Sequence, residues 1–207
     1  MTRLAVPRLA GRHVALEPMT LDHVDAIAAA GAGDRSTFGY TQVPDGRDEA
    51  AEYVRWLLDD AAHDRAVPFV QRRIVGGVDD AVVGCTRFMN PLWPLGRADP
   101  DEVEVGGTWL TPSAQRTAVN TEAKLLLLTH AFEVWNTQRV AICTDARNEQ
   151  SRRAIERLGA EFEGVLRRHR RSTRAGDDGV LRDTATYSVT IDDWPDVRAL
   201  LAGRLGA

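Results

Sequence analysis

The amino-acid sequence predicts a mixed α/β fold, and three observations support this fold class. Residues 104–159 read as two successive strand–loop–helix units, because β-rich apolar segments alternate with segments in which apolar residues recur at helical spacing. A hairpin pattern precedes these units, and a second hairpin pattern follows them. Elements in this order are typical of a mixed sheet flanked by helices. The 207 residues suit a single domain, 1–207.

The first half of the chain contains one strand, two helices and a hairpin. Residues 13–18 alternate apolar and polar side chains as a strand does, and Thr20 caps the helix that follows. Residues 48–64 form a second helix, with aromatic and aliphatic side chains on one face. Two strand-like segments, 68–75 and 82–90, then flank a glycine-containing turn and predict a hairpin.

The second half starts with the two strand–loop–helix units. Their strands are expected at 103–110 and 139–144, and their helices at 120–135 and 151–158. The closing segments are a hairpin of residues 161–170 and 182–191, and a helix of residues 196–205.

Composition and charge exclude several classes of protein. The formal net charge of -4 disfavours a dedicated nucleic-acid binder. The longest aliphatic run, 125–128, is far shorter than a membrane span, and the amino terminus lacks the apolar run of a signal peptide. We therefore expect a cytoplasmic protein. Cys85 and Cys143 each lie inside a strand-like segment, as small buried residues do, and no group of side chains has the spacing of a metal site.

Two segments of the second half carry a resemblance to a known family. They read Asn120-Thr121-Glu122-Ala123-Lys124-Leu125-Leu126-Leu127-Leu128 and Arg147-Asn148-Glu149-Gln150-Ser151-Arg152-Arg153-Ala154-Ile155-Glu156-Arg157-Leu158-Gly159-Ala160. Together they resemble the GNAT acetyltransferase superfamily in its RimJ/RimL-like branch, and segments 164–167 and 182–195 resemble the same branch. The likeness covers about residues 11–205, which is the expected core of the domain.

This resemblance implies a GNAT-like fold, in which a mixed sheet of six to seven strands is flanked by helices. Two neighbouring parallel strands separate near the centre of such a sheet, and the thioester arm of acetyl-CoA lies in the cleft between them. The resemblance therefore implies acetyl-CoA as co-substrate and an acyltransferase reaction without a metal.

Residues 115–120 join a predicted strand to a predicted helix and are the candidate for an anion site. Free backbone N–H groups and the helix dipole at such a junction attract a phosphate. By resemblance this loop holds the pyrophosphate, although Ala118 and Asn120 stand where the family has glycine, and alanine adopts positive φ poorly. An ordinary helix-capping loop is the alternative. The expected cofactor-binding residues are Leu110, Gln115, Arg116, Thr117, Ala118, Val119, Asn120, Thr121, Asn148, Ser151 and Arg153.

Glu104 is the residue that the resemblance implies as the catalytic base, acting on the acceptor amine directly or through water. A protonated amine cannot attack a thioester, so the reaction needs a group that removes this proton near neutral pH. Glu102, on the same face of the predicted strand, is the substitute. The alternative reading of Glu104 is a strand carboxylate paired with an arginine.

Asn148 and Ser151 lie at the start of the second predicted helix. By resemblance Asn148 hydrogen-bonds the pantetheine arm, and Ser151 lies near the cofactor sulfur and takes part in catalysis. Many relatives place an acidic tyrosine where this chain has Ile155, so Ser151 or water would protonate the leaving thiolate. Helix capping is the alternative role for Asn148 and Ser151.

Positive charge is concentrated in residues 151–174, which contain eight arginines against three glutamates. Such a segment is a candidate for contact with anions. Under the family resemblance, Arg152, Arg153 and the run 167–171 would meet the 3′-phosphate of CoA or an acidic acceptor. A solvated charged face is the alternative.

The sequence thus predicts an acetyl-CoA-dependent N-acetyltransferase that transfers the acetyl group to a primary amine by direct attack on the thioester. The acceptor is expected to be a protein amino terminus or a small-molecule amine, bordered by the aromatic-bearing loops 36–46 and 91–101. A non-catalytic CoA-binding sensor or interaction module of the same fold is the alternative. No nucleic-acid or membrane partner is expected, and a homodimer stays open.

Overall fold

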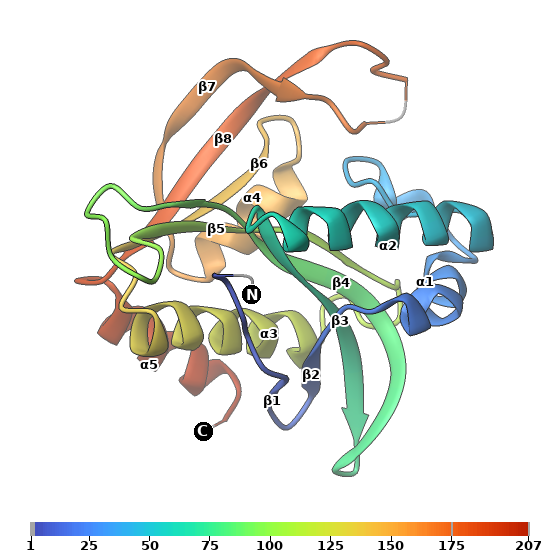
Figure 1. Ribbon diagram of the computed structural model, residues 1–207, viewed down its shortest axis with the longest axis horizontal. Coiled ribbons are helices and arrows are strands. Elements are labelled where there is room, and N and C mark those ends of the chain that lie inside the picture. Colours follow the sequence, from blue (N-terminus) through green and yellow to red (C-terminus); the bar gives the residue numbers. More distant parts are fainter. Residues whose placement is uncertain (1–2, 175, 207) are drawn as a thin grey trace.

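A single open sheet of eight strands organises the molecule (Figure 1). The computed structural model describes residues 3–174 and 176–206. The strand order is β1-β2-β3-β4-β5-β6-β8-β7, and β5–β6 is the one parallel pair among the described strands. The strands are β1 Leu9–Ala10, β2 Val14–Pro18, β3 Ala66–Val75, β4 Val78–Leu92, β5 Glu102–Leu110, β6 Arg139–Asp145, β7 Glu161–Arg171 and β8 Leu181–Thr190.

Helices pack on both faces of this sheet. They are α1 Val24–Gly31, α2 Gly46–Ala62, α3 Ala118–Thr129, α4 Glu149–Arg157 and α5 Trp194–Arg204, with short 3₁₀ turns at Leu21–His23 and Ser36–Phe38. The predicted helix 120–135 ends as a π-helix, His130–Val134. None of the helices among the described residues combines the length and the apolar character that a membrane span requires. The prediction of a mixed α/β fold with flanking helices is confirmed.

The strand count is the part of the fold that the family resemblance predicted wrongly, since the sheet has eight strands rather than six to seven. The short strand β1 pairs with β2 over two residues only, which is too short to produce a visible alternation. The turn between β1 and β2 is stabilised by a residue far away in the sequence. The carboxylate of Glu122 in α3 accepts hydrogen bonds from three successive backbone N–H groups, at residues 12–14.

Two apolar cores lie on opposite faces of the sheet, and a bulge in β5 lets one strand serve both. Val103 and Val105 pack with α3, whereas Trp109, which strict alternation would place on the same face, packs with α1 and α2. The register of β4 and β5 shifts at this point, and Gly107 has φ +57°. A Cβ at Gly107 would also lie 2.8 Å from the guanidinium carbon of Arg87, so a larger residue there would displace Arg87 and glycine is favoured.

The two parallel strands separate just before the bulge in β5. β5 and β6 pair only from Glu102 to Glu104, against Arg139 to Ala141, although both strands continue well past this point. Glu104 is therefore the last paired residue of β5 before the strands part. This arrangement is the central splay that the resemblance implied.

Candidate active site

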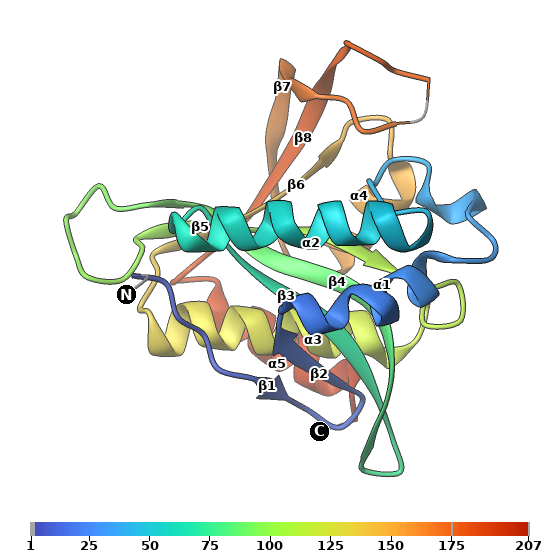
Figure 2. The same ribbon diagram turned by 45° about the vertical axis from the view of Figure 1, so that its right-hand side comes forward.

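One cavity of about 970 Å³ follows the splay between β5 and β6. Its lining combines polar side chains with residues of both apolar cores. Its walls come from the loop 36–42, β4, β5, the start of α3, β6, the start of α4 and the β7–β8 hairpin. In Figures 1 and 2 this hairpin rises away from the other strands beside β6.

The loop before α3 forms one end of the cavity. Gln115, Arg116, Thr117, Asn120 and Thr121 line it together with Leu110. Gln115 is fixed by hydrogen bonds from its amide nitrogen to the Leu110 carbonyl oxygen (3.0 Å) and to Thr37 Oγ1 (2.9 Å). Thr117 caps α3, since its Oγ1 accepts from the Val119 N–H at 3.3 Å.

Ala118 and Val119 do not line the cavity, unlike the rest of the expected cofactor loop. Val119 is buried in the α3 core, and Ala118 is the first residue of the helix. The left-handed residue of the loop is Arg116, with φ +58°. The chain therefore takes its positive φ two residues before Ala118, where the family resemblance had pointed to glycine.

The start of α4 forms the neighbouring wall, and it contributes Asn148 and Ser151. Asn148 Oδ1 accepts from the Ser151 N–H at 3.0 Å, so Asn148 caps the helix while it faces the cavity. Arg153 lies on the exposed side of α4, where it pairs with Glu149, and it does not line the cavity. Arg152 likewise lies outside, with its guanidinium bonded to the Tyr187 hydroxyl at 3.1 Å.

Glu104 lies deep in the cavity and is only 5% exposed. Arg170 donates two hydrogen bonds to its carboxylate, at 2.9 and 2.7 Å, and Asn90 donates a third at 2.9 Å. These bonds raise the pKa of the Arg170 guanidinium above its ordinary value, so the guanidinium stays charged. Glu102 pairs with Arg139 and does not line the cavity. Glu104 is therefore paired with an arginine, as the alternative reading expected, and it also lines the cavity, as a catalytic base would.

Lys124, the single lysine of the chain, also lines the cavity, and sequence reasoning missed it. Its Nζ is buried and donates to Thr108 Oγ1 at 2.7 Å, with Thr86 Oγ1 at 3.5 Å. Burial without a carboxylate partner lowers its pKa to about 7. The available signal was its place one helical turn after Asn120, on the face that α3 buries.

Two further side chains constrain the chemistry of the cavity. Ile155 lines it where relatives were expected to have an acidic tyrosine, so no proton donor is present at that position. Cys143 lines it as well, and burial raises the pKa of its thiol to about 11. A thiol that stays protonated at neutral pH is a weak nucleophile, which favours direct attack by the acceptor over an acyl-cysteine intermediate.

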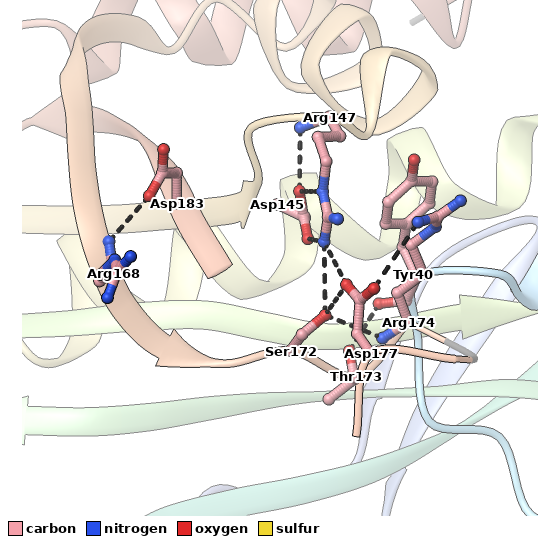
Figure 3. Close-up of polar contacts among 9 residues, drawn as sticks. All are labelled: Tyr40, Asp145, Arg147, Arg168, Ser172, Thr173, Arg174, Asp177 and Asp183. Carbon is pink, nitrogen blue, oxygen red and sulfur yellow. Dashed lines mark hydrogen bonds and ion pairs between the residues drawn. The ribbon is translucent and has the colours of Figure 1, made fainter. Parts of the chain in front are cut away.

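The loop 36–42 lines the cavity, and so do Arg171 and Thr173 near the start of the β7–β8 loop. Figure 3 shows the polar contacts that connect these segments. Thr173 Oγ1 donates to the Tyr40 carbonyl oxygen at 2.8 Å. The guanidinium of Arg147 binds Asp145 and Asp177 and lies 6.0 Å from the centre of the Tyr40 ring. These contacts join two loops that are far apart in the sequence.

The loop 91–101, which was expected to border the acceptor, supplies none of the described residues that line the cavity. Asp101 accepts hydrogen bonds from the Leu95 N–H and from Arg97, and Arg3 lies 4.5 Å from the ring centre of Trp93. These contacts fold the loop against the amino-terminal segment. The β7–β8 loop occupies the position that was expected for it.

Comparison with known proteins identifies the family. The family model for the Acetyltransferase (GNAT) domain matches residues 13–161. The chain belongs to the GNAT acetyltransferase family. A crystal structure of an acetyltransferase from T. thermophilus is 35% identical, with TM-score 0.80, over 98% of this chain and 99% of that chain. The predicted family and its acyltransferase class are therefore confirmed.

Relatives with more specific names are more distant or match over a shorter span. YdaF of Bacillus subtilis (strain 168), named as a ribosomal N-acetyltransferase, is 33% identical over 88 residues, which are 42% of this chain and 45% of that protein. The match thus covers less than half of the curated relative. A structure of Mycobacterium smegmatis RimJ in complex with CoA-disulfide is 22% identical, with TM-score 0.74, over 97% of this chain and 94% of that chain, a likeness that supports the fold alone.

Proposed function

We propose that the protein is an acetyl-CoA-dependent N-acetyltransferase that acts on a primary amine by direct attack on the thioester. The observation that carries this proposal is the splay of β5 and β6, which opens one cavity onto the starts of α3 and α4 and onto Glu104. Family membership supports the same reaction class.

The cofactor end of the cavity suits the diphosphate and pantetheine parts of acetyl-CoA. Gln115 to Thr121 would hold the pyrophosphate, because the amino terminus of α3 presents backbone N–H groups and a partial positive charge. Arg116 adds a guanidinium there. Asn148 and Ser151 would border the pantetheine arm, with the Asn148 amide nitrogen as a hydrogen-bond donor.

Glu104 would receive the proton of the attacking amine, directly or through one water. Although Arg170 and Asn90 donate to its carboxylate, two carboxylate oxygens offer about four lone-pair sites, so an acceptor site remains. The paired Arg170 fixes the orientation of the carboxylate. Ser151 or water would then protonate the CoA thiolate, since Ile155 cannot.

The acceptor would be a protein amino terminus or a small amine. The name of YdaF supports a protein acceptor, over the shorter span that it matches. The joined loops 36–42 and 171–173 border the end of the cavity where such an acceptor would enter.

A CoA-binding module without turnover is the second candidate. The absent tyrosine at Ile155 and the close engagement of Glu104 by Arg170 favour it. The two candidates differ in one measurable property, which is release of free CoA thiol in the presence of an amine.

Two measurements test the proposal in sequence. Calorimetry should show binding of CoA and acetyl-CoA, and no binding at millimolar concentration would overturn both candidates. Thiol release from acetyl-CoA across a panel of peptides and small amines should then exceed the rate without acceptor. Binding of CoA with no amine-dependent thiol release would leave the non-catalytic module.

A further inference from the structure

The cavity is strongly basic in a protein that is acidic as a whole. The formal net charge of the chain is -4. The cavity is nevertheless lined by seven basic residues and two acidic ones: Arg87, Arg116, Lys124, Arg157, Arg170, Arg171 and Arg182 against Glu104 and Glu149. Phosphates of CoA at the start of α3 would account for only part of this excess. The remainder is concentrated around the β7–β8 hairpin.

Arg170 and Arg182 are direct partners in the register of β7 and β8. Their side chains therefore share one face of the hairpin, where like charges opposite one another destabilise a sheet. Glu104 neutralises Arg170 through two hydrogen bonds. One carboxylate thus compensates one of two adjacent guanidinium groups.

Among the described residues, Arg182 is a cavity-lining cation that lacks both an ion pair and a partner for a buried nitrogen atom. Its Nε is buried and has no hydrogen-bond partner among them, and they form no ion pair with its guanidinium. Burial lowers the pKa of Arg182, and the adjacent Arg170 lowers it further. Asp145 is the nearest source of negative charge, but its carboxylate is already bound by Arg147 at 2.7 and 2.9 Å.

Arg182 is half-buried, and the buried Nε of its guanidinium is costly because burial removes water without supplying an acceptor. The cavity reaches Arg182, so a ligand can supply the missing anion. That anion could be a phosphate of CoA or a carboxylate of the acceptor. Arg170, the strand partner of Arg182, contacts Glu104, and this favours the acceptor as the source.

We propose that Arg182 binds a carboxylate of the acceptor, so that the protein selects amines that carry an acidic group. This inference rests on the proposed acetyltransferase function and narrows its substrate class. Arg170 connects the two protein groups that such an acceptor would meet, because it is the strand partner of Arg182 and donates a hydrogen bond to Glu104. A carboxylate at Arg182 would place the nearby amine toward Glu104. The carboxylate can come from the side chain of an amino-terminal Asp or Glu, or from a free amino acid.

Matched acceptors and one matched control variant test the proposal. The peptide acceptors are Asp-Ala-Ala-amide and Asn-Ala-Ala-amide, and the small acceptors are glycine and glycinamide. In the wild-type protein the carboxylate member of at least one pair should have the higher kcat/KM, by about tenfold or more, as expected for a charged hydrogen bond. The peptide pair and the small pair distinguish the two sources of the carboxylate.

Arg182→Gln should reduce this preference to near unity and leave the affinity for CoA unchanged. Arg167→Gln removes one exposed arginine of the same hairpin, outside the cavity lining, and should keep the preference. Thermal unfolding provides a separate readout. Because the buried Nε of Arg182 has no partner among the described residues, Arg182→Gln should not lower Tm, whereas replacing a purely structural arginine would lower it.

Binding of the same peptides to the CoA-loaded protein separates this inference from the proposed function. Calorimetry of that complex needs no turnover, since CoA carries no acetyl group. Tighter binding of the Asp peptide without any thiol release would overturn the acetyltransferase proposal and keep the carboxylate site. Equal binding of the Asp and Asn peptides and of the two small amines, with equal kcat/KM within each pair, would overturn the carboxylate site.

Discussion

The two ends of the cavity are built in different ways. At the proposed cofactor end, two continuous segments supply much of the lining, and helix starts provide backbone N–H groups at α3 and α4. At the acceptor end, the contacts come from side chains, and the strands that carry them are far apart in the sequence. Glu104 and Arg170, for example, are separated by 66 positions.

This difference separates what backbone geometry determines from what depends on charge. Helix starts attract phosphates whatever the side chains are, so the cofactor end tolerates replacements in its loop. The proposed acceptor end holds the Glu104–Arg170 pair and the half-buried Arg182, and the buried Lys124 also lines the cavity without an ion pair among the described residues. Changes at the acceptor end should therefore have larger effects than changes at the cofactor end.

The largest effect is expected for Glu104→Gln. The substitution removes the proposed base and leaves two adjacent guanidinium groups without a carboxylate. Turnover should fall by about 10² or more. The free energy of unfolding should fall by about 2 kcal/mol, which discounts the usual cost of a broken buried pair because Arg170 is partly exposed. Thiol release and urea denaturation measure the two effects.

The double variant Glu104→Gln with Arg170→Met separates the two roles of Glu104. Removing the orphaned cation should restore much of the stability, whereas turnover should remain low. Affinity for CoA should be nearly unchanged in both variants. If Glu104→Gln keeps the wild-type rate, Glu104 is structural and water alone removes the proton.

The sequence predicted more of the cavity-lining residues at the proposed cofactor end than at the proposed acceptor end, for a physical reason. Thr117 and Asn148 cap helices within their own segments, so local patterns reveal them. The Glu104–Arg170 pair depends on strand order, because β8 lies between β6 and β7 in the sheet. No local pattern encodes this order. The same limit explains why loop 91–101 was expected at the rim that loop 171–173 occupies.

The missed residues, Lys124 and Arg182, were visible in the sequence but could not be distinguished there. Burial decides their significance, and burial follows from the packing of α3 on the sheet and from the pairing of β7 with β8. A cation at a helix or strand position is more often a solvated side chain. The fold class was accessible because it depends on periodicity, which the sequence shows directly.

An intermediate effect is expected for Lys124→Met, which tests the second unpaired cation. The folded-state pKa of about 7 lies below the ordinary value of 10.5, so the unfolded state binds more protons between these pH values. Wild-type stability at this site should therefore rise as pH increases from 7 to about 10. The variant should be more stable by a few kcal/mol at pH 7 and should lack this contribution.

The two threonines near Lys124 make the test interpretable. Thr86 Oγ1 and Thr108 Oγ1 are 2.9 Å apart, so they can satisfy each other when the amine is removed. Urea denaturation of both proteins at pH 7, 8.5 and 10 gives the difference in stability, from which other titrating groups cancel. A difference that stays constant with pH would show that Lys124 is charged throughout and is compensated in the folded protein.

The smallest effect is expected at the cofactor end, for Ala118→Gly. Ala118 begins α3, and the residue with positive φ is Arg116, so glycine at 118 relieves no strain. It should instead lower the free energy of unfolding by less than about 1 kcal/mol, through its weaker helix propensity. The affinity for CoA, measured by calorimetry, should be unchanged, because the backbone N–H groups remain in place.

Arg116→Gly provides the opposite combination and sharpens the comparison. Glycine accommodates φ +58° without the cost of about 1 kcal/mol that other residues bear, so stability should rise slightly. Affinity for CoA should fall, because the variant loses a guanidinium that lines the cofactor end. A gain in CoA affinity for Ala118→Gly would contradict this reading, since it would mean that the loop is strained at residue 118 and that the backbone of the cofactor end is not yet arranged for phosphate.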